Sequence, residues 1–190
     1  MMAPATITNN SWTGRDYAWL FLAMFPAAIL SWGIHEGAHY LMGRALGYRM
    51  WISFNQVGLV EGDYASLLHR NLVSAAGPMI TAVQAVLAWW FVRKTKALWA
   101  YALVFLTVWT RLLALVISLV SIPNDEARIS LSLGLPIWVL PSISVAFMLW
   151  FTVLASRTLQ VGWKGNLVAY LGASIVTPLI VFSDKLLFFG

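Results

Sequence analysis

An apolar stretch over residues 17–46 constrains the fold of this chain most, because it is long enough to cross a bilayer as a helix. Within it lies an H-E-x-x-H pattern that begins at His35 and ends at His39. On a helix, residues four positions apart project from one face, so both imidazoles can bind one Zn²⁺ while Glu36 acts on a water molecule at the metal. We therefore expect a metal site inside a membrane helix.

The composition is that of a helical membrane protein, with 61% hydrophobic and only 10% charged residues. The sequence has no cysteine, so the protein ligands of any metal must be histidines and carboxylates. Residues 1–16 carry no basic segment ahead of an apolar core, so we expect no cleaved secretory signal. The net charge of +5 suits an anionic lipid surface and gives no indication of nucleic-acid binding.

Further apolar spans cover residues 72–92, 97–122, 133–155 and 167–188. We therefore predict an all-α polytopic membrane protein with about five transmembrane helices, forming one membrane-embedded domain over residues 1–190. Pro26 lies in the first span, and Pro136 and Pro141 lie near the start of the fourth, so kinks or a re-entrant segment are expected there. Basic residues are divided almost evenly between the two ends, which leaves the orientation and the host membrane open.

The connection over residues 47–61 is rich in β-branched and aromatic residues. It predicts a short β-hairpin that turns near residues 55–58. A free strand edge beside the metal site can accept an extended segment of another chain by β-addition. The alternative is an amphipathic turn at the membrane surface.

Two histidines need a third protein ligand. The acidic, amide and imidazole candidates are Glu61, Asp63, His69, Asn124, Asp125 and Glu126. Because the first and third membrane helices run in the same direction, the end of the third helix lies on the same side of the membrane as His39. We therefore expect Asp125 to be the ligand; the alternative is that Asp125 ends a surface helix with Arg128 as its partner.

Other interpretations of the polar residues remain open. The two histidines can instead be pore-facing or bond between helices, with Glu36 paired to Arg44. Arg111 lies in the middle of the third span, 14 residues before Asp125, which is roughly 21 Å along a helix. We expect it to snorkel toward the membrane surface or to pair inside the bundle with a carboxylate such as Asp184, and not to touch the metal site.

The run HEGAHYLMGRALGYRMWISFNQVGLV, the AAGP at residues 75–78 and the Pro-x-Asp element that ends at Asp125 resemble the site-2 protease family of intramembrane zinc metalloproteases. The resemblance covers residues 18–133. It implies one Zn²⁺ per chain, held by His35, His39 and Asp125, with Glu36 as the catalytic residue. The family's Gly-Pro motif corresponds to Gly77 and Pro78, which the resemblance assigns to substrate positioning.

The sequence departs from the family pattern at two places. Thr81 stands where the family often has Asn. Asn124-Asp125-Glu126 replaces Leu-Asp-Gly, which makes Glu126 a competing ligand and Asn124 a polar neighbour of the site. No PDZ or nucleotide-sensing segment is found.

The resemblance implies peptide hydrolysis in or near the transmembrane segments of membrane-protein substrates. Two alternatives stay open: a membrane zinc hydrolase of a lipid or small amphiphile, and a non-enzymatic metal-binding or transport protein. The identity of the substrate and the oligomeric state cannot be predicted from the sequence.

Overall fold

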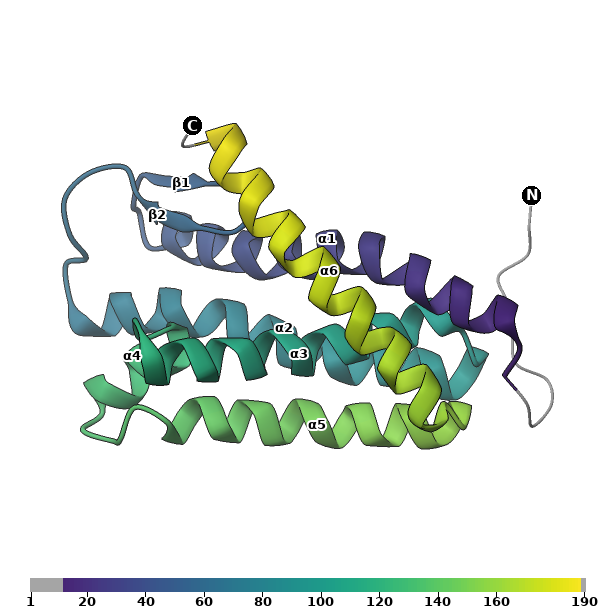
Figure 1. The fold of residues 1–190 in the computed structure, drawn as a ribbon. Helices are drawn as coiled ribbons and strands as arrows, with labels where there is room; N and C mark the ends of the chain where they lie inside the picture. The colour runs from purple at the N-terminus through teal and green to yellow at the C-terminus, as the bar shows by residue number, and fades with distance from the viewer. Residues whose placement is uncertain (1–11, 189–190) are drawn as a thin grey trace.

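Five long helices dominate the computed structural model, which describes residues 12–188 (Figure 1). They are α1 (Gly14–Ala45), α2 (Leu67–Thr95), α3 (Leu98–Val120), α5 (Val139–Leu159) and α6 (Gly162–Phe188). Each is long and apolar enough to cross a membrane. The remaining elements are a short helix, α4 (Asp125–Ser132), and two strands, β1 (Met50–Ile52) and β2 (Val57–Leu59). The expected polytopic helical fold, with a small antiparallel hairpin between the first two helices, is confirmed.

The fourth predicted span begins too early. Residues 125–132 form α4, and Gly134, with φ +72°, lies in the turn that follows. Pro136 stands in this turn, and Pro141 lies in the first turn of α5, where a missing backbone N–H leaves no helical bond unmade. The short α4 was not predicted, and its first residue is Asp125, the predicted third metal ligand.

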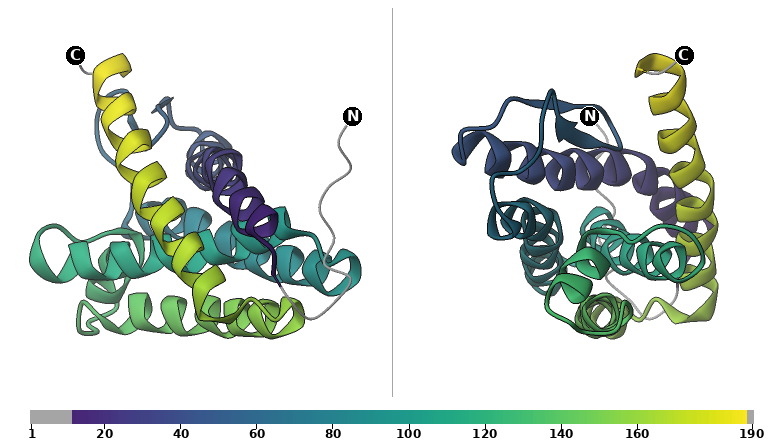
Figure 2. Two further views of the ribbon diagram at one scale, coloured as in Figure 1. Left: turned by 45° about the vertical axis from the view of Figure 1, so that its right-hand side comes forward. Right: turned by 90° about the vertical axis from the view of Figure 1, so that its left-hand side faces the viewer.

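The helices form one bundle in which α1 and α2 pack on each other and both pack on α3. This helix contacts α1, α2 and α5, while α6 crosses obliquely and packs mainly on α1 (Figures 1 and 2). Near the amino-terminal end of α1, the core is mainly apolar and contains buried Leu20, Met24, Tyr101 and Val104. Buried alanines between these side chains allow the helices to approach closely.

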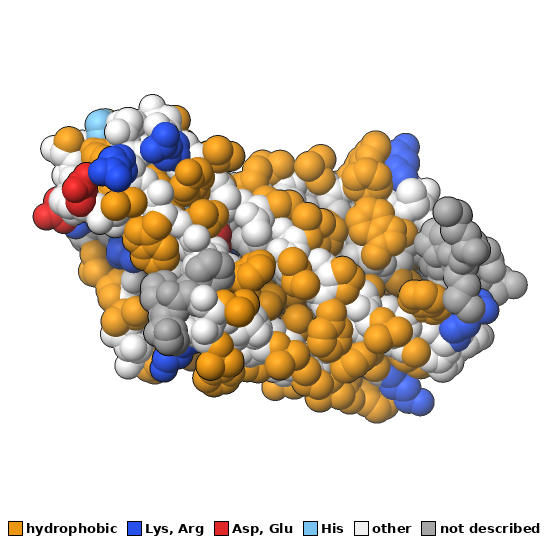
Figure 3. Space-filling view, turned by 90° about the horizontal axis from the view of Figure 1, so that it is seen from above, with side chains coloured by type: hydrophobic (Ala, Val, Ile, Leu, Met, Phe, Trp, Pro, Cys, Tyr) orange, Lys and Arg blue, Asp and Glu red, His pale blue; other side chains and the backbone are white. Residues whose placement is uncertain are grey.

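The surface carries a broad hydrophobic band with charged groups at its two ends (Figure 3). At the end where α1 begins, the basic residues are Arg15, Arg93, Lys94, Lys96, Arg157 and Lys164. Aromatic rings accompany them, as where the Arg93 guanidinium lies 5.8 Å from the centre of the Trp89 ring. An apolar band with aromatic and charged ends is typical of a protein that crosses a bilayer several times.

The hairpin turns at residues 53–56, two residues earlier than predicted, so Gly58 lies in β2 opposite Trp51. α6 holds this turn, because Asp184 accepts hydrogen bonds from Ser53 Oγ (3.0 Å) and from the Phe54 backbone N–H (2.6 Å).

α1 holds the tip of the same turn. The indole N–H of Trp32 donates to Asn55 Oδ1 at 3.0 Å. Because Trp32 lies one helical turn before His35, the hairpin is fastened beside the histidine pair.

Candidate metal centre

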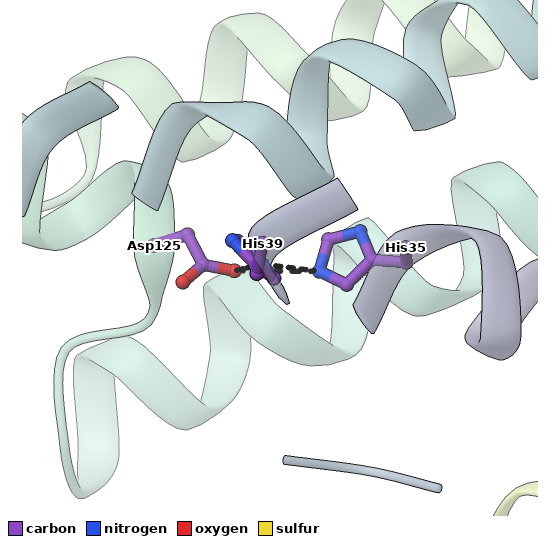
Figure 4. Close-up of side chains that lie close together, drawn as sticks. All are labelled: His35, His39 and Asp125. Carbon is purple, nitrogen blue, oxygen red and sulfur yellow. Dashed lines mark hydrogen bonds and ion pairs between the residues drawn. The ribbon is translucent and has the colours of Figure 1, made fainter. Parts of the chain in front are cut away.

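His35 and His39 project from the buried face of α1, and Asp125 reaches them from the first residue of α4 (Figure 4). The two Nε2 atoms lie 3.1 Å apart. Asp125 Oδ2 lies 3.4 Å from His35 Nε2 and 3.2 Å from His39 Nε2. The structure therefore brings together the two histidines and the carboxylate that the sequence predicts as ligands.

These separations suit a metal ion. Zinc binds imidazole nitrogen and carboxylate oxygen at about 2.0–2.2 Å in a tetrahedral arrangement, which separates neighbouring ligand atoms by about 3.3 Å. The three separations in the cluster are 3.1, 3.2 and 3.4 Å. The His35, His39 and Asp125 group can thus hold a metal ion with a fourth position left open.

Helix α2 orients both imidazoles through their Nδ1 atoms. His39 Nδ1 donates to the Val73 carbonyl at 2.6 Å. Thr81 Oγ1 donates to the Gly77 carbonyl (2.9 Å), so its oxygen accepts from His35 Nδ1 (3.0 Å). With both Nδ1 atoms donating, a neutral ring presents the Nε2 lone pair to the cluster. This is the usual arrangement around a metal-binding histidine.

Gly77 allows α2 to lie close to the imidazoles of His35 and His39. A Cβ at this position would collide with Nε2 of His39 and would lie 2.7 Å from Nε2 of His35. Any residue other than glycine would therefore displace the rings or the helix. Pro78 is buried beside it, inside α2. The Gly-Pro pair thus lies against the ligand group, and Gly77 supports the ligands directly.

Asp125 is placed by a reversal of the chain. α3 ends at Val120, and Asn124 caps α4 by accepting a hydrogen bond from the Ala127 N–H at 3.0 Å. Asp125 Oδ1 accepts a hydrogen bond from Arg128 Nη2 at 2.5 Å, while Oδ2 faces the imidazoles of His35 and His39. Asp125 therefore has both the Arg128 partner of the alternative prediction and the place beside the histidines of the main one.

Burial by itself would raise the pKa of the Asp125 carboxyl, but the adjacent His35 and His39 imidazoles hold that pKa well below its usual range. The direction of this shift favours the ionised carboxylate, which is the form that binds a metal.

Glu36 is buried next to the cluster, between the two histidines in sequence. Its carboxylate forms no hydrogen bond or ion pair with any residue from 12 to 188. Arg44, the partner considered from the sequence, donates instead to the Tyr48 carbonyl at 3.4 Å. Glu36 is thus free to exchange a proton with a molecule beside the cluster.

Two cavities meet at Glu36 and Asp125. The hairpin cavity, of about 700 Å³, lies between the hairpin and the ends of α1, α2 and α3. It is lined in part by His39, Val57, Leu59 and Tyr64. The inner cavity, of about 320 Å³, lies between α1, α3 and α6. Both cavities therefore border Glu36 and Asp125.

The remaining ligand candidates lie elsewhere. Glu61 forms an exposed ion pair with Arg49 at 2.8 Å. His69 accepts a hydrogen bond from the Tyr48 hydroxyl at 2.8 Å, because that hydroxyl oxygen itself accepts from the Ala65 N–H. Asp63 is exposed at the rim of the hairpin cavity.

Arg111 pairs with a carboxylate inside the bundle, as predicted, but the partner is Glu126 and the suggestion of Asp184 is wrong. Arg111 Nη1 donates to both carboxylate oxygens of Glu126, at 3.1 and 3.3 Å. Because the chain reverses after α3, Glu126 returns beside Arg111 instead of continuing away from it. Arg111 therefore lines the inner cavity together with the cluster, and Glu126 faces Arg111 rather than the imidazoles.

Sequence reasoning did not identify the groups that orient the histidines. The Val73 carbonyl is a backbone atom and leaves no signal in the sequence. The sequence did contain a signal for Thr81, because it lies four residues after Gly77 and so occupies the same face of α2.

No protein-family model matches the chain, and the comparisons with curated proteins and with solved structures also find no match.

Proposed function

We propose that this protein is an intramembrane zinc metalloprotease with a site similar to that of the site-2 protease family. One observation carries the proposal: three ligand atoms lie within 3.4 Å of one another, inside an apolar helix bundle, with an unpartnered carboxylate beside them. Ionisable groups in membrane helices are expensive and mark functional sites. The H-E-x-x-H spacing adds the two roles, ligand and base, that metal-assisted hydrolysis requires.

Zinc is the metal that suits this ligand set best, since two imidazoles and one carboxylate with an open fourth position are typical of catalytic zinc sites. When bound, zinc would polarise a peptide carbonyl and make a water molecule more acidic. His35, His39 and Asp125 would hold the ion.

Glu36 would act as the general base. It would take a proton from water as the water oxygen attacks the peptide carbonyl carbon, and would then deliver that proton to the leaving amine as the C–N bond breaks. The lack of any other partner for Glu36 among residues 12–188 supports this role.

The hairpin would align the substrate. Ser53 N–H donates to the Gln56 carbonyl, and Val60 N–H donates to the Arg49 carbonyl, each at 2.9 Å. By the alternation of an antiparallel ladder, the backbone groups of Val57 and Leu59 point away from β1, and both residues line the hairpin cavity. An unwound substrate segment can pair with this edge, which would present an extended peptide to Glu36.

The test is product mapping by mass spectrometry on single-pass membrane substrates in liposomes, with His35→Ala/His39→Ala as the inactive control. Substrate helices that carry Gly, Asn or Pro near the scissile bond should be cut faster than Leu- and Ala-rich versions, because their backbone is exposed at lower cost. Cuts confined to water-exposed loops, at rates that ignore these substitutions, would contradict intramembrane proteolysis.

A further inference from the structure

A buried ion pair joins α3 to the first turn of α4, one residue after Asp125. Arg111 Nη1 lies 3.1 Å from Glu126 Oε1, and the two side chains are only 9% and 7% exposed. Asn124 Nδ2 donates to Glu126 Oε2 at 3.1 Å, and the Asn124 backbone N–H donates to Ser118 Oγ at 3.0 Å. The two residues that flank Asp125, Asn124 and Glu126, thus both belong to this network.

The stability of the bundle does not explain this pair. Removing two charges from water is expensive, and replacing a buried ion pair by apolar residues often leaves stability unchanged or raises it. Arg111 Nε is also buried without a hydrogen-bond partner among the described residues, which adds a further penalty. Buried ion pairs of this kind are best known for fixing one arrangement of their elements.

The arrangement that this pair fixes is the rotation of the first turn of α4. Successive residues on a helix point about 100° apart, so anchoring Glu126 toward α3 sets the direction of Asp125. α4 packs on α2 and α5. Arg111 links it to α3 through the ion pair with Glu126. Metal ligands must be held within about 0.5 Å of their working positions.

We propose that the Arg111–Glu126 pair positions Asp125 as the third metal ligand. The inference rests on the proposed metal site and assigns to it two residues that do not touch the ligand atoms. Both would act as positioning residues, and their loss should weaken metal binding without weakening the fold.

The test replaces both charges at once, because removing only one would leave the other charge buried and unpaired. Zinc affinity by chelator competition and the melting temperature of the zinc-free protein are measured for Arg111→Met/Glu126→Leu. The matched control is Arg49→Met/Glu61→Leu, which removes an ion pair of 2.8 Å whose side chains are each 70% exposed. We expect zinc affinity about 10–100-fold weaker in the first variant, as for other groups that orient ligands, with its melting temperature unchanged or raised. The control should match the parent in both measurements.

Parental zinc affinity in Arg111→Met/Glu126→Leu would overturn the inference and leave the proposed function standing. A double variant that fails to fold would also overturn it, because the pair would then be needed for the bundle itself. A parent protein that binds no zinc would remove the proposed metal site, and this inference with it.

Discussion

The two halves of the α1–α2–α3 bundle are built from the same helices but from opposite kinds of side chain. At one end, Leu20, Met24 and Val104 make a core with no charge. At the other end, at least three turns further along α1, the interior contains His35, Glu36, His39, Thr81, Gln84 and Arg111. The buried side chains of these helices thus change from apolar to polar within the length of the same helices.

The polar half shows which of its groups have a structural use. Gln84 Nε2 donates to Ser31 Oγ at 3.0 Å, and His39 Nδ1 donates to the Val73 carbonyl. Buried polar groups are normally satisfied in this way, because an unmade hydrogen bond is costly away from water. Glu36 alone among the acidic groups named at the cluster lacks such a partner within residues 12–188. Under the proposed function, Glu36 is the group used for chemistry and the others hold the architecture.

The sharpest way to test that separation is Glu36→Gln, which keeps the size of the side chain and removes its basicity. We expect turnover of a membrane substrate to fall by about 10²–10⁴-fold, with zinc content and melting temperature unchanged. Glu61→Gln, at an exposed ion pair, is the control. Turnover at the parental rate by purified Glu36→Gln would show that the carboxylate is not the base.

The apolar half should behave in the opposite way. Leu20→Ala removes a fully buried side chain and leaves a cavity, so the free energy of unfolding should fall by about 2 kcal/mol. Zinc affinity should stay at the parental value, because the site lies several turns away. Reversible unfolding in mixed micelles and chelator competition measure the two quantities. A loss of zinc affinity equal to the loss of stability would mean that the halves are not independent.

Gly77→Ala tests the contact that joins α2 to the ligands. The added Cβ would displace the His35 and His39 rings, so zinc affinity should fall about tenfold or more. Gly33→Ala is the matched control, since a Cβ there would meet nothing within 4 Å. Equal zinc affinities in the two variants would contradict the close approach of α2 to the imidazoles.

The predictable part of the site follows from local periodicity and chain direction. The spacing of His35 and His39 places both on one helix face, and the direction of α3 returns the chain to them at Asp125. The partner of Arg111 was not predictable, because it depends on where α3 ends and on the reversal that forms α4. Asp184, whose charge suggested that partner, instead accepts hydrogen bonds from the hairpin turn at Ser53 and Phe54.

The central claim is that His35, His39 and Asp125 hold one zinc ion, and the zinc content of purified protein tests it most directly. The parent protein should contain about one zinc per chain. The His35→Ala/His39→Ala variant should contain no zinc, and Asp125→Ala should lose most of its zinc. Glu126→Gln should retain more zinc than Asp125→Ala. Stoichiometric zinc in the variant that lacks both histidines would contradict the account.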